Sequence, residues 1–215
     1  MGINSNGKKE KSAGKKLWYF LWEDNSVWSW VVSLILAFII VKFLFFPLLS
    51  FGLNNSLPLV VIESGSMHHE GSWFKDLTGV AITSGDRLEG WWDAGNGEWY
   101  EERNIILPEA EDWRFSWGMD KGDIVVVYGE DTDDLEVGDV VIFNAGQANP
   151  IIHRIVDIRE ENGTRIFSTK GDNNTGQLTF EKNIGENQII GKAVLRVNKV
   201  GWVKLIFVEI FRAFS

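Results

Sequence analysis

Cysteine is absent from the 215 residues of this chain. Its absence excludes a disulfide framework, thiol catalysis and thiolate metal sites, but leaves the compartment open because many exported proteins lack disulfides. Basic residues are also scarce, 21 against 30 acidic residues, and the net charge of -9 argues against nucleic acid as a partner. With 45% hydrophobic and 24% charged residues, the chain has the composition of a folded protein with room for one anchor and one domain of good size.

One long apolar run occupies residues 27–49, and Lys42 is its only charged residue. A helix of this length reaches about 34 Å, which is enough to cross a hydrocarbon core. The run is longer than the apolar part of an export signal and has no small-residue cleavage site, so we expect a retained transmembrane anchor. The alternative is a buried core helix, which apolarity all round the helix disfavours.

Lysines cluster ahead of this run and not directly beyond it: Lys8, Lys9, Lys11, Lys15 and Lys16. The positive-inside bias therefore keeps residues 1–26, a basic tail, in the cytoplasm. The chain is expected to cross the cell membrane once, with its larger, C-terminal part on the extracytoplasmic face.

Short runs rich in β-branched residues follow the anchor, at residues 58–63, 123–128, 137–143, 151–158, 165–169 and 188–197. Glycine, asparagine and aspartate separate them, and no helix-length connection lies between the last five. Residues 56–69 and 121–198 are therefore predicted to form a compact, mainly antiparallel β catalytic core, as an open sheet or a barrel. Lys121-Gly122-Asp123 and Val137-Gly138-Asp139 each precede a strand and predict a repeated turn-then-strand device.

An insertion with a different character occupies residues 70–120. It holds six tryptophans and twelve acidic residues against four basic ones. We expect short helices and loops that form a lid burying its own tryptophans. The alternatives are a cover over the active site, a partner-binding surface, and a surface whose aromatic rings lie among lipid headgroups.

Residues 199–215 predict a C-terminal amphipathic helix. Its apolar face would carry Val203, Ile206, Phe207, Ile210, Phe211 and Phe214. The helix is too short for a comfortable second crossing, so it either packs on the domain or lies in the membrane plane, and the anchor favours the plane.

Ser64-Gly65-Ser66-Met67 follows the first strand directly, which would present the Ser66 hydroxyl on a tight bend. Acyl transfer needs a base for such a hydroxyl and hydrogen-bond donors for the oxyanion. Ser64 lies on the same side of the chain, so its hydroxyl and the Ser66 amide could be those donors. Taken alone, this tetrapeptide also fits an ordinary turn.

Only three histidines could act as the base. His153 lies within an apolar strand pattern and is either a satisfied core residue or a base. His68 and His69 are expected to be exposed loop residues, because bending either ring back onto Ser66 needs a contorted loop. A metal site of His68, His69 and Glu70 is the weakest idea, since adjacent residues cannot converge on one ion.

Asp172 is the candidate acid, in the turn Gly171-Asp172-Asn173-Asn174 at the end of a strand. Its carboxylate could hold the tautomer of His153 and stabilise the imidazolium. Aspartate in such a turn is also a common turn former.

Together, and in this order after an anchor, several segments resemble type I signal peptidase. They are E-S-G-S-M (63–67), K-G-D-I-V-V-V (121–127), I-I-H-R-I-V (151–156), T-K-G-D-N-N (169–174) and I-I-G-K-A-V (189–194). The histidine version is similar to the archaeal and endoplasmic-reticulum branch, which uses serine, histidine and aspartate. The resemblance implies a serine endopeptidase that removes signal peptides from exported preproteins in protein secretion, with Ser66 as nucleophile, His153 as base, Asp172 as its orienting acid and Ser64 as oxyanion donor.

The sequence departs from this family pattern in two places. A second aspartate expected a few residues after Asn174 is absent, so the acidic role rests on Asp172 or on Glu181 or Glu186 nearby. The insertion at 70–120 is the other departure. No metal or organic cofactor is implied, accessory subunits stay unknown, and the alternatives are a serine-lysine dyad using Lys170 or a non-catalytic, membrane-tethered binding module.

Overall fold

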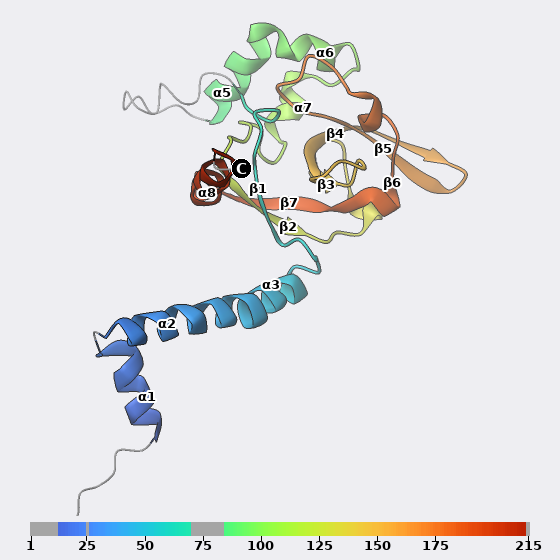
Figure 1. Ribbon diagram of the computed structural model, residues 1–215. Coiled ribbons are helices and arrows are strands. Elements are labelled where there is room, and N and C mark those ends of the chain that lie inside the picture. The colour runs from blue at the N-terminus through green and yellow to red at the C-terminus, as the bar shows by residue number, and fades with distance from the viewer. Residues whose placement is uncertain (1–12, 25, 70–83, 214–215) are drawn as a thin grey trace, which may run out of the picture. The chain divides into compact units, whose positions relative to one another are not determined.

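The computed structural model describes residues 13–24, 26–69 and 84–213 (Figure 1). The predictions for Lys8, Lys9 and Lys11, for residues 70–83 and for Phe214 lie outside this range. The chain divides into two compact units, Met1–Leu49 and Ser50–Ser215.

The first unit is helical. Helix α1 spans Ala13–Trp22, and α2 spans Val27–Ile40 after Ser26, whose hydroxyl accepts a hydrogen bond from the Ser29 amide at the helix start. A π-helical turn at Val41–Phe45 continues α2 into α3 (Phe46–Gly52), which ends in the second unit. The whole helix, Val27–Gly52, has a mean hydropathy of 2.7 in its most apolar stretch, and none of that stretch is buried. By length and composition it can cross a membrane, and its exposure argues against a buried core helix.

The second unit is built on a curled seven-stranded antiparallel sheet in the order β1-β2-β7-β3-β4-β5-β6. The strands are β1 (Leu59–Val61), β2 (Ile124–Tyr128), β3 (Val140–Phe143), β4 (Ile151–Glu161), β5 (Thr164–Lys170), β6 (Ile184–Gly185) and β7 (Ile189–Val197). The prediction of a mainly antiparallel β core is therefore confirmed. Two details differ: residues 137–139 form a turn and not the start of β3, and the two-residue strand β6 has no counterpart among the predicted strands.

The two turn-then-strand segments have the same local geometry. Gly122 has a φ of +90° and Gly138 a φ of +98°, a region where side chains are strained. One carboxylate oxygen of Asp123 accepts the Asp120 amide, and one of Asp139 accepts the Glu136 amide. The resemblance between the two segments thus reflects one turn used twice, each time leading into a strand.

The core of the second unit has three clusters. Both faces of β3 are buried, so Val140 and Ile142 join one cluster while Val141 and Phe143 join another. The third cluster lies within the insertion, whose described part folds as α5 (Ser84–Trp91), a π-helical turn (Trp92–Asn96), α6 (Gly97–Glu101) and α7 (Leu107–Glu111). It contains Leu88, Trp91, Trp92, Tyr100, Ile105 and Ala110, and it packs on Val156 of β4. Trp91 and Trp92 are buried, so these two tryptophans do lie inside the insertion's own core.

The last helix, α8, spans Trp202–Ala213 and packs beside the end of β1 (Figure 1). Leu205 is 6% exposed and faces the domain, and a Cβ added to Gly201 would lie 2.6 Å from Val61. Val203, Ile206, Phe207 and Ile210 are exposed. The helix therefore packs on the domain by one side and leaves most of its predicted apolar face uncovered.

Replacing Gly138 by alanine should destabilise the protein by about 3 kcal/mol. Alanine is strained at this φ, and its Cβ would also lie 2.2 Å from the Trp113 ring. Gly163 is the matched control, since its φ is +77° but nothing lies within 4 Å, so Gly163→Ala should cost only about 1 kcal/mol. Urea unfolding of the detergent-solubilised chain measures both. Equal losses of unfolding free energy in the two variants would contradict a clash between the added Cβ and the Trp113 ring.

Candidate active site

Ser66 lies in a loop between β1 and a buried methionine. Met67 is 1% exposed and belongs to the sheet's core, and its carbonyl oxygen accepts the Met119 amide at 2.7 Å. Ser64 is exposed and Ser66 partly so. Their hydroxyl oxygens are 3.1 Å apart, within hydrogen-bonding distance. The loop thus presents two adjacent hydroxyls at the surface while its following residue is fixed in the core.

His153 lies on β4 and is 4% exposed. Its Nδ1 hydrogen-bonds to an oxygen of Glu181, a buried residue at the end of a 3-10 turn over Thr179–Glu181. The other carboxylate oxygen of Glu181 accepts the Leu178 amide. A neutral imidazole that donates from Nδ1 leaves Nε2 as the proton acceptor.

The turn at residues 171–174 contacts both of these elements. The Asn173 amide donates to the Ser66 carbonyl at 2.8 Å, and the Asn173 side chain donates to the Gly65 carbonyl at 3.2 Å. A Cβ added to Gly171 would lie 2.8 Å from Nε2 of His153. The loop that carries Ser66 and the Nε2 atom of His153 therefore meet the same short turn, although among the described residues no hydrogen bond joins the Ser66 hydroxyl to His153.

Asp172 lies in the middle of this turn and does not pair with His153, which corrects the predicted pairing. Its carboxylate accepts Nε of Arg154 at 3.0 Å and a terminal nitrogen of the same guanidinium at 2.7 Å. His69 Nε2 lies 3.1 Å from it, and the Tyr100 hydroxyl donates at 3.3 Å. Burial by itself raises the pKa of Asp172, but the Arg154 charge and the hydrogen bonds from His69 and Arg154 hold it well below its ordinary range. The physical reason for the correction is that these partners occupy both carboxylate oxygens.

Arg154, next to His153 on β4, is 1% exposed. Besides Asp172, its guanidinium donates to the carbonyl oxygens of Arg114, Phe115 and Gly138 at 2.8 to 3.0 Å. A buried guanidinium with these partners is fully hydrogen-bonded, which compensates for its removal from water.

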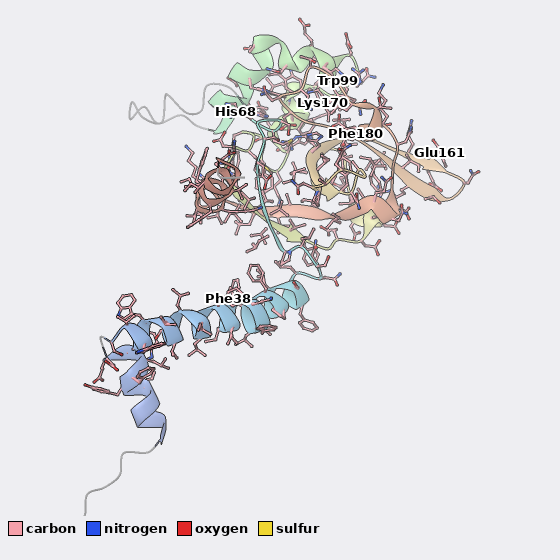
Figure 2. The ribbon with its side chains drawn as sticks, in the orientation of Figure 1. Phe38, His68, Trp99, Glu161, Lys170 and Phe180 are labelled. Atoms are coloured by element: carbon pink, nitrogen blue, oxygen red, sulfur yellow. The ribbon has the colours of Figure 1, made fainter. Side chains whose placement is uncertain are left out.

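Lys170, the alternative base, is also buried. Its ammonium donates to the carbonyl oxygens of Gly171 and Asp172 at 3.1 Å each. It lies 5.2 Å from the centre of the Trp99 ring, beside which Figure 2 labels it, and 4.8 Å from that of Tyr100. Burial lowers the pKa of Lys170 to about 8. Lys170 is therefore easier to deprotonate than an exposed lysine. Its described contacts, however, are with rings of the insertion and with backbone carbonyl oxygens.

His69 differs from the prediction of an exposed loop residue. It is 2% exposed, and its ring stacks on Trp91 with 4.0 Å between centres and 5° between planes. His68 is partly exposed and contacts Asp120 through Nδ1 at 2.6 Å. The two rings therefore engage different carboxylates, and no metal-binding cluster occurs among the described residues.

No sequence pattern indicates that His69 and Tyr100 contact Asp172. Tyr100 lies in the insertion, 72 residues from Asp172, and no motif relates the two. The sequence indicates Glu181 only as a replacement for the missing aspartate, because it lies a few residues after Asp172 in the chain.

Lowering the pH should destabilise the protein through His69. Burial lowers the pKa of its ring, although the hydrogen bond with Asp172 opposes this. Between the ordinary histidine pKa and the lower folded value, the unfolded chain binds the proton more tightly, so stability present above about pH 6.5 is lost as the pH falls. His69→Gln should therefore show a flatter decline of unfolding free energy between pH 7 and pH 5 than the unmodified chain. If the unfolding free energies of the two proteins declined in parallel with pH, His69 would not be the group responsible.

Three curated relatives are similar to part of the chain, and all are described as signal peptidase complex catalytic subunit SEC11. The proteins of Scheffersomyces stipitis, Clavispora lusitaniae and Yarrowia lipolytica are 29%, 34% and 30% identical over 96, 98 and 98 residues. Each match covers 41% of this chain and 57%, 57% and 55% of the relative. The chain thus spans little more than half the length of the curated relatives it matches.

No family model matches the chain. The three relatives bear out the resemblance to type I signal peptidase of the endoplasmic-reticulum type. All three are yeast proteins, so the archaeal side of that resemblance stays a prediction.

Proposed function

We propose that this chain, which resembles the type I signal peptidases of the endoplasmic-reticulum branch, is a membrane-bound serine endopeptidase that removes signal peptides from exported preproteins. Ser66 is its nucleophile and His153 its general base. The observation that carries the proposal is the surroundings of His153: Glu181 occupies Nδ1, while Nε2 faces the turn that also binds the Ser66 backbone.

The reaction needs the Ser66 hydroxyl, which lies within hydrogen-bonding distance of the Ser64 hydroxyl, to turn toward His153. Nε2 then takes the hydroxyl proton as Oγ attacks the carbonyl carbon of the scissile bond. Collapse of the tetrahedral intermediate breaks the carbon–nitrogen bond, and the imidazolium gives its proton to the leaving amine. Water activated by the same imidazole then hydrolyses the acyl-enzyme ester and frees Ser66.

Glu181 replaces Asp172 in the role of orienting acid within this proposal. Its carboxylate holds the proton of His153 on Nδ1 and stabilises the imidazolium that forms during acylation. The Ser64 hydroxyl and the Ser66 amide are the proposed oxyanion donors, as expected from their positions on one loop.

Cleavage of a model preprotein by the detergent-solubilised chain tests the function, with the cut mapped by mass. Ser66→Ala and His153→Ala should each abolish cleavage, because they remove the nucleophile and its base. Lys170→Gln keeps a donor for the two carbonyl oxygens but cannot act as a base, so measurable cleavage should remain. Cleavage by Ser66→Ala would refute the proposal and favour a binding module, whereas loss in Lys170→Gln with activity in His153→Ala would favour a serine-lysine dyad.

Glu181→Gln should lower kcat by about 100-fold or more, because a glutamine amide can hold the imidazole in the wrong tautomer. Glu186→Gln is the matched control. Glu186 accepts the Arg165 amide at 2.8 Å and has no described contact with His153, so its replacement should change kcat less than twofold. Steady-state cleavage at saturating substrate measures both. Similar rates for Glu181→Gln and the unmodified chain would remove Glu181 from the mechanism.

The helix Val27–Gly52 is the proposed membrane anchor, with the N-terminus in the cytoplasm and the catalytic unit on the extracytoplasmic face of the cell membrane. The N-terminal lysine cluster supports this orientation. The relatives are named as catalytic subunits of a complex, and accessory subunits for this chain are proposed on that name alone.

The lipid bilayer is also the proposed cover of the exposed face of α8. Val203 is 63% and Phe207 59% exposed, and a bilayer is the apolar phase to which the anchor would tether this unit. Lys204 binds Glu63 at 3.0 Å, so the helix is linked to the residue directly before Ser64.

Single-cysteine labelling tests this cover, since the chain has no cysteine of its own. A fluorophore on Phe207→Cys, in the full chain reconstituted in lipid nanodiscs, should emit at shorter wavelength and be quenched by spin-labelled lipids. Glu161→Cys, at the tip of the β4–β5 hairpin (Figure 2), is the exposed control and should show neither effect. Equal, weak quenching at the two sites would contradict the bilayer contact.

A further inference from the structure

The insertion meets the catalytic unit at one buried carboxylate. Tyr100 is fully buried, and its hydroxyl donates to Asp172 at 3.3 Å. Asp172 is itself 1% exposed and sits between Gly171, which abuts His153, and Asn173, whose amide binds the Ser66 carbonyl. A side chain of the insertion thus reaches the turn that contacts both proposed catalytic residues.

Further contacts from the insertion converge on the same place. Trp91 stacks on His69, which is the second histidine after Ser66 and which also contacts Asp172. The carbonyl oxygens of Arg114 and Phe115 accept hydrogen bonds from Arg154, the principal partner of Asp172. Each of these contacts restrains a partner of Asp172, and so they hold the carboxylate from several directions.

The insertion holds Tyr100 within a packed apolar cluster. Its apolar cluster, which includes Trp91 and Tyr100, packs on Val156 of β4, two residues after Arg154. The Tyr100 ring lies 5.8 Å from the Trp91 ring and 5.6 Å from the Trp92 ring, centre to centre. Burial also raises the pKa of Tyr100 well above its ordinary value, so the hydroxyl keeps the proton it donates.

We infer that the insertion is a positioning element, in which Tyr100 acts through Asp172 to hold the turn at residues 171–174 in the geometry that Ser66 and His153 need. The inference rests on the proposed function for its effect on catalysis, but not for its effect on the turn. It assigns the insertion a task different from covering the active site. Tyr100 touches neither reacting residue and is therefore a positioning residue.

Hydrogen exchange tests the effect on the turn without any activity. In a Ser66→Ala background, Tyr100→Phe should speed exchange of the Asn173 amide by on the order of tenfold, because the turn loses one of its buried restraints. Tyr128→Phe is the matched control. Tyr128 is an exposed residue of β2 with no described side-chain hydrogen bond, and its replacement should leave that amide unchanged. Unchanged exchange in Tyr100→Phe would overturn the inference.

Kinetics test the effect on catalysis in the full chain. A fluorophosphonate, which labels a reactive serine, counts the active sites so that kcat is expressed per active site. On this basis Tyr100→Phe should lower kcat on the order of tenfold and change KM by less than twofold. Asp172→Asn should lower kcat at least as much, and the double variant should be no slower than Asp172→Asn alone, because Tyr100 acts through Asp172. A merely structural role would lower Tm and leave kcat per titrated site unchanged.

The outcomes separate this inference from the proposed function. Losses that multiply in the double variant, or an unchanged kcat in Tyr100→Phe, would overturn the positioning role while Ser66→Ala stayed inactive. Cleavage by Ser66→Ala would overturn the peptidase itself, and the exchange of the Asn173 amide would still decide whether the insertion holds the turn. Should Tyr100→Phe fail to fold, Trp91→Phe, which keeps an aromatic ring against His69, should show a smaller change in the same direction, and no change would count against the inference.

Discussion

The buried ion pair between Arg154 and Asp172 holds several elements of the second unit together. Two charges taken out of water are costly unless each is fully hydrogen-bonded. Here the guanidinium contacts both carboxylate oxygens and three carbonyl groups, while His69 and Tyr100 complete the surroundings of Asp172. One pair thereby joins strand β4, the turn after β5, the loop after Ser66 and the insertion.

This pair also explains why the carboxylate beside His153 comes from another part of the chain. Asp172 has no oxygen left for the imidazole, because Arg154 and His69 lie against both. The family pattern has a second aspartate after this turn, and here the 3-10 turn at Thr179–Glu181 brings a glutamate to Nδ1 instead. A longer side chain from a later position can take the same place, because what matters is a carboxylate within hydrogen-bonding distance of Nδ1 and not the residue that carries it.

The insertion combines an acidic composition with an apolar core of its own. Most of the carboxylates whose burial is described, such as Asp93, Glu98 and Glu109, are exposed, whereas Trp91, Trp92 and Tyr100 form a core that packs on β4. The tryptophans at 91 and 92 therefore build a packed core within the insertion. Lys170 also contacts this cluster. Its buried ammonium lies against the Trp99 and Tyr100 rings and donates to the carbonyl oxygens of Gly171 and Asp172.

Local patterns predict the apolar helix and most of the strands: a long apolar run, β-branched segments and turn residues. They also place Ser66 directly after one strand and His153 within another. The partners of the charged groups depend instead on tertiary contacts, which no local pattern predicts. Asp172 was expected beside His153 and lies with Arg154, while His69 was expected in solvent and lies against Trp91. The physical reason is that a buried carboxylate is satisfied by whichever donors the folded chain brings within about 3 Å, and these come from residues far apart in sequence.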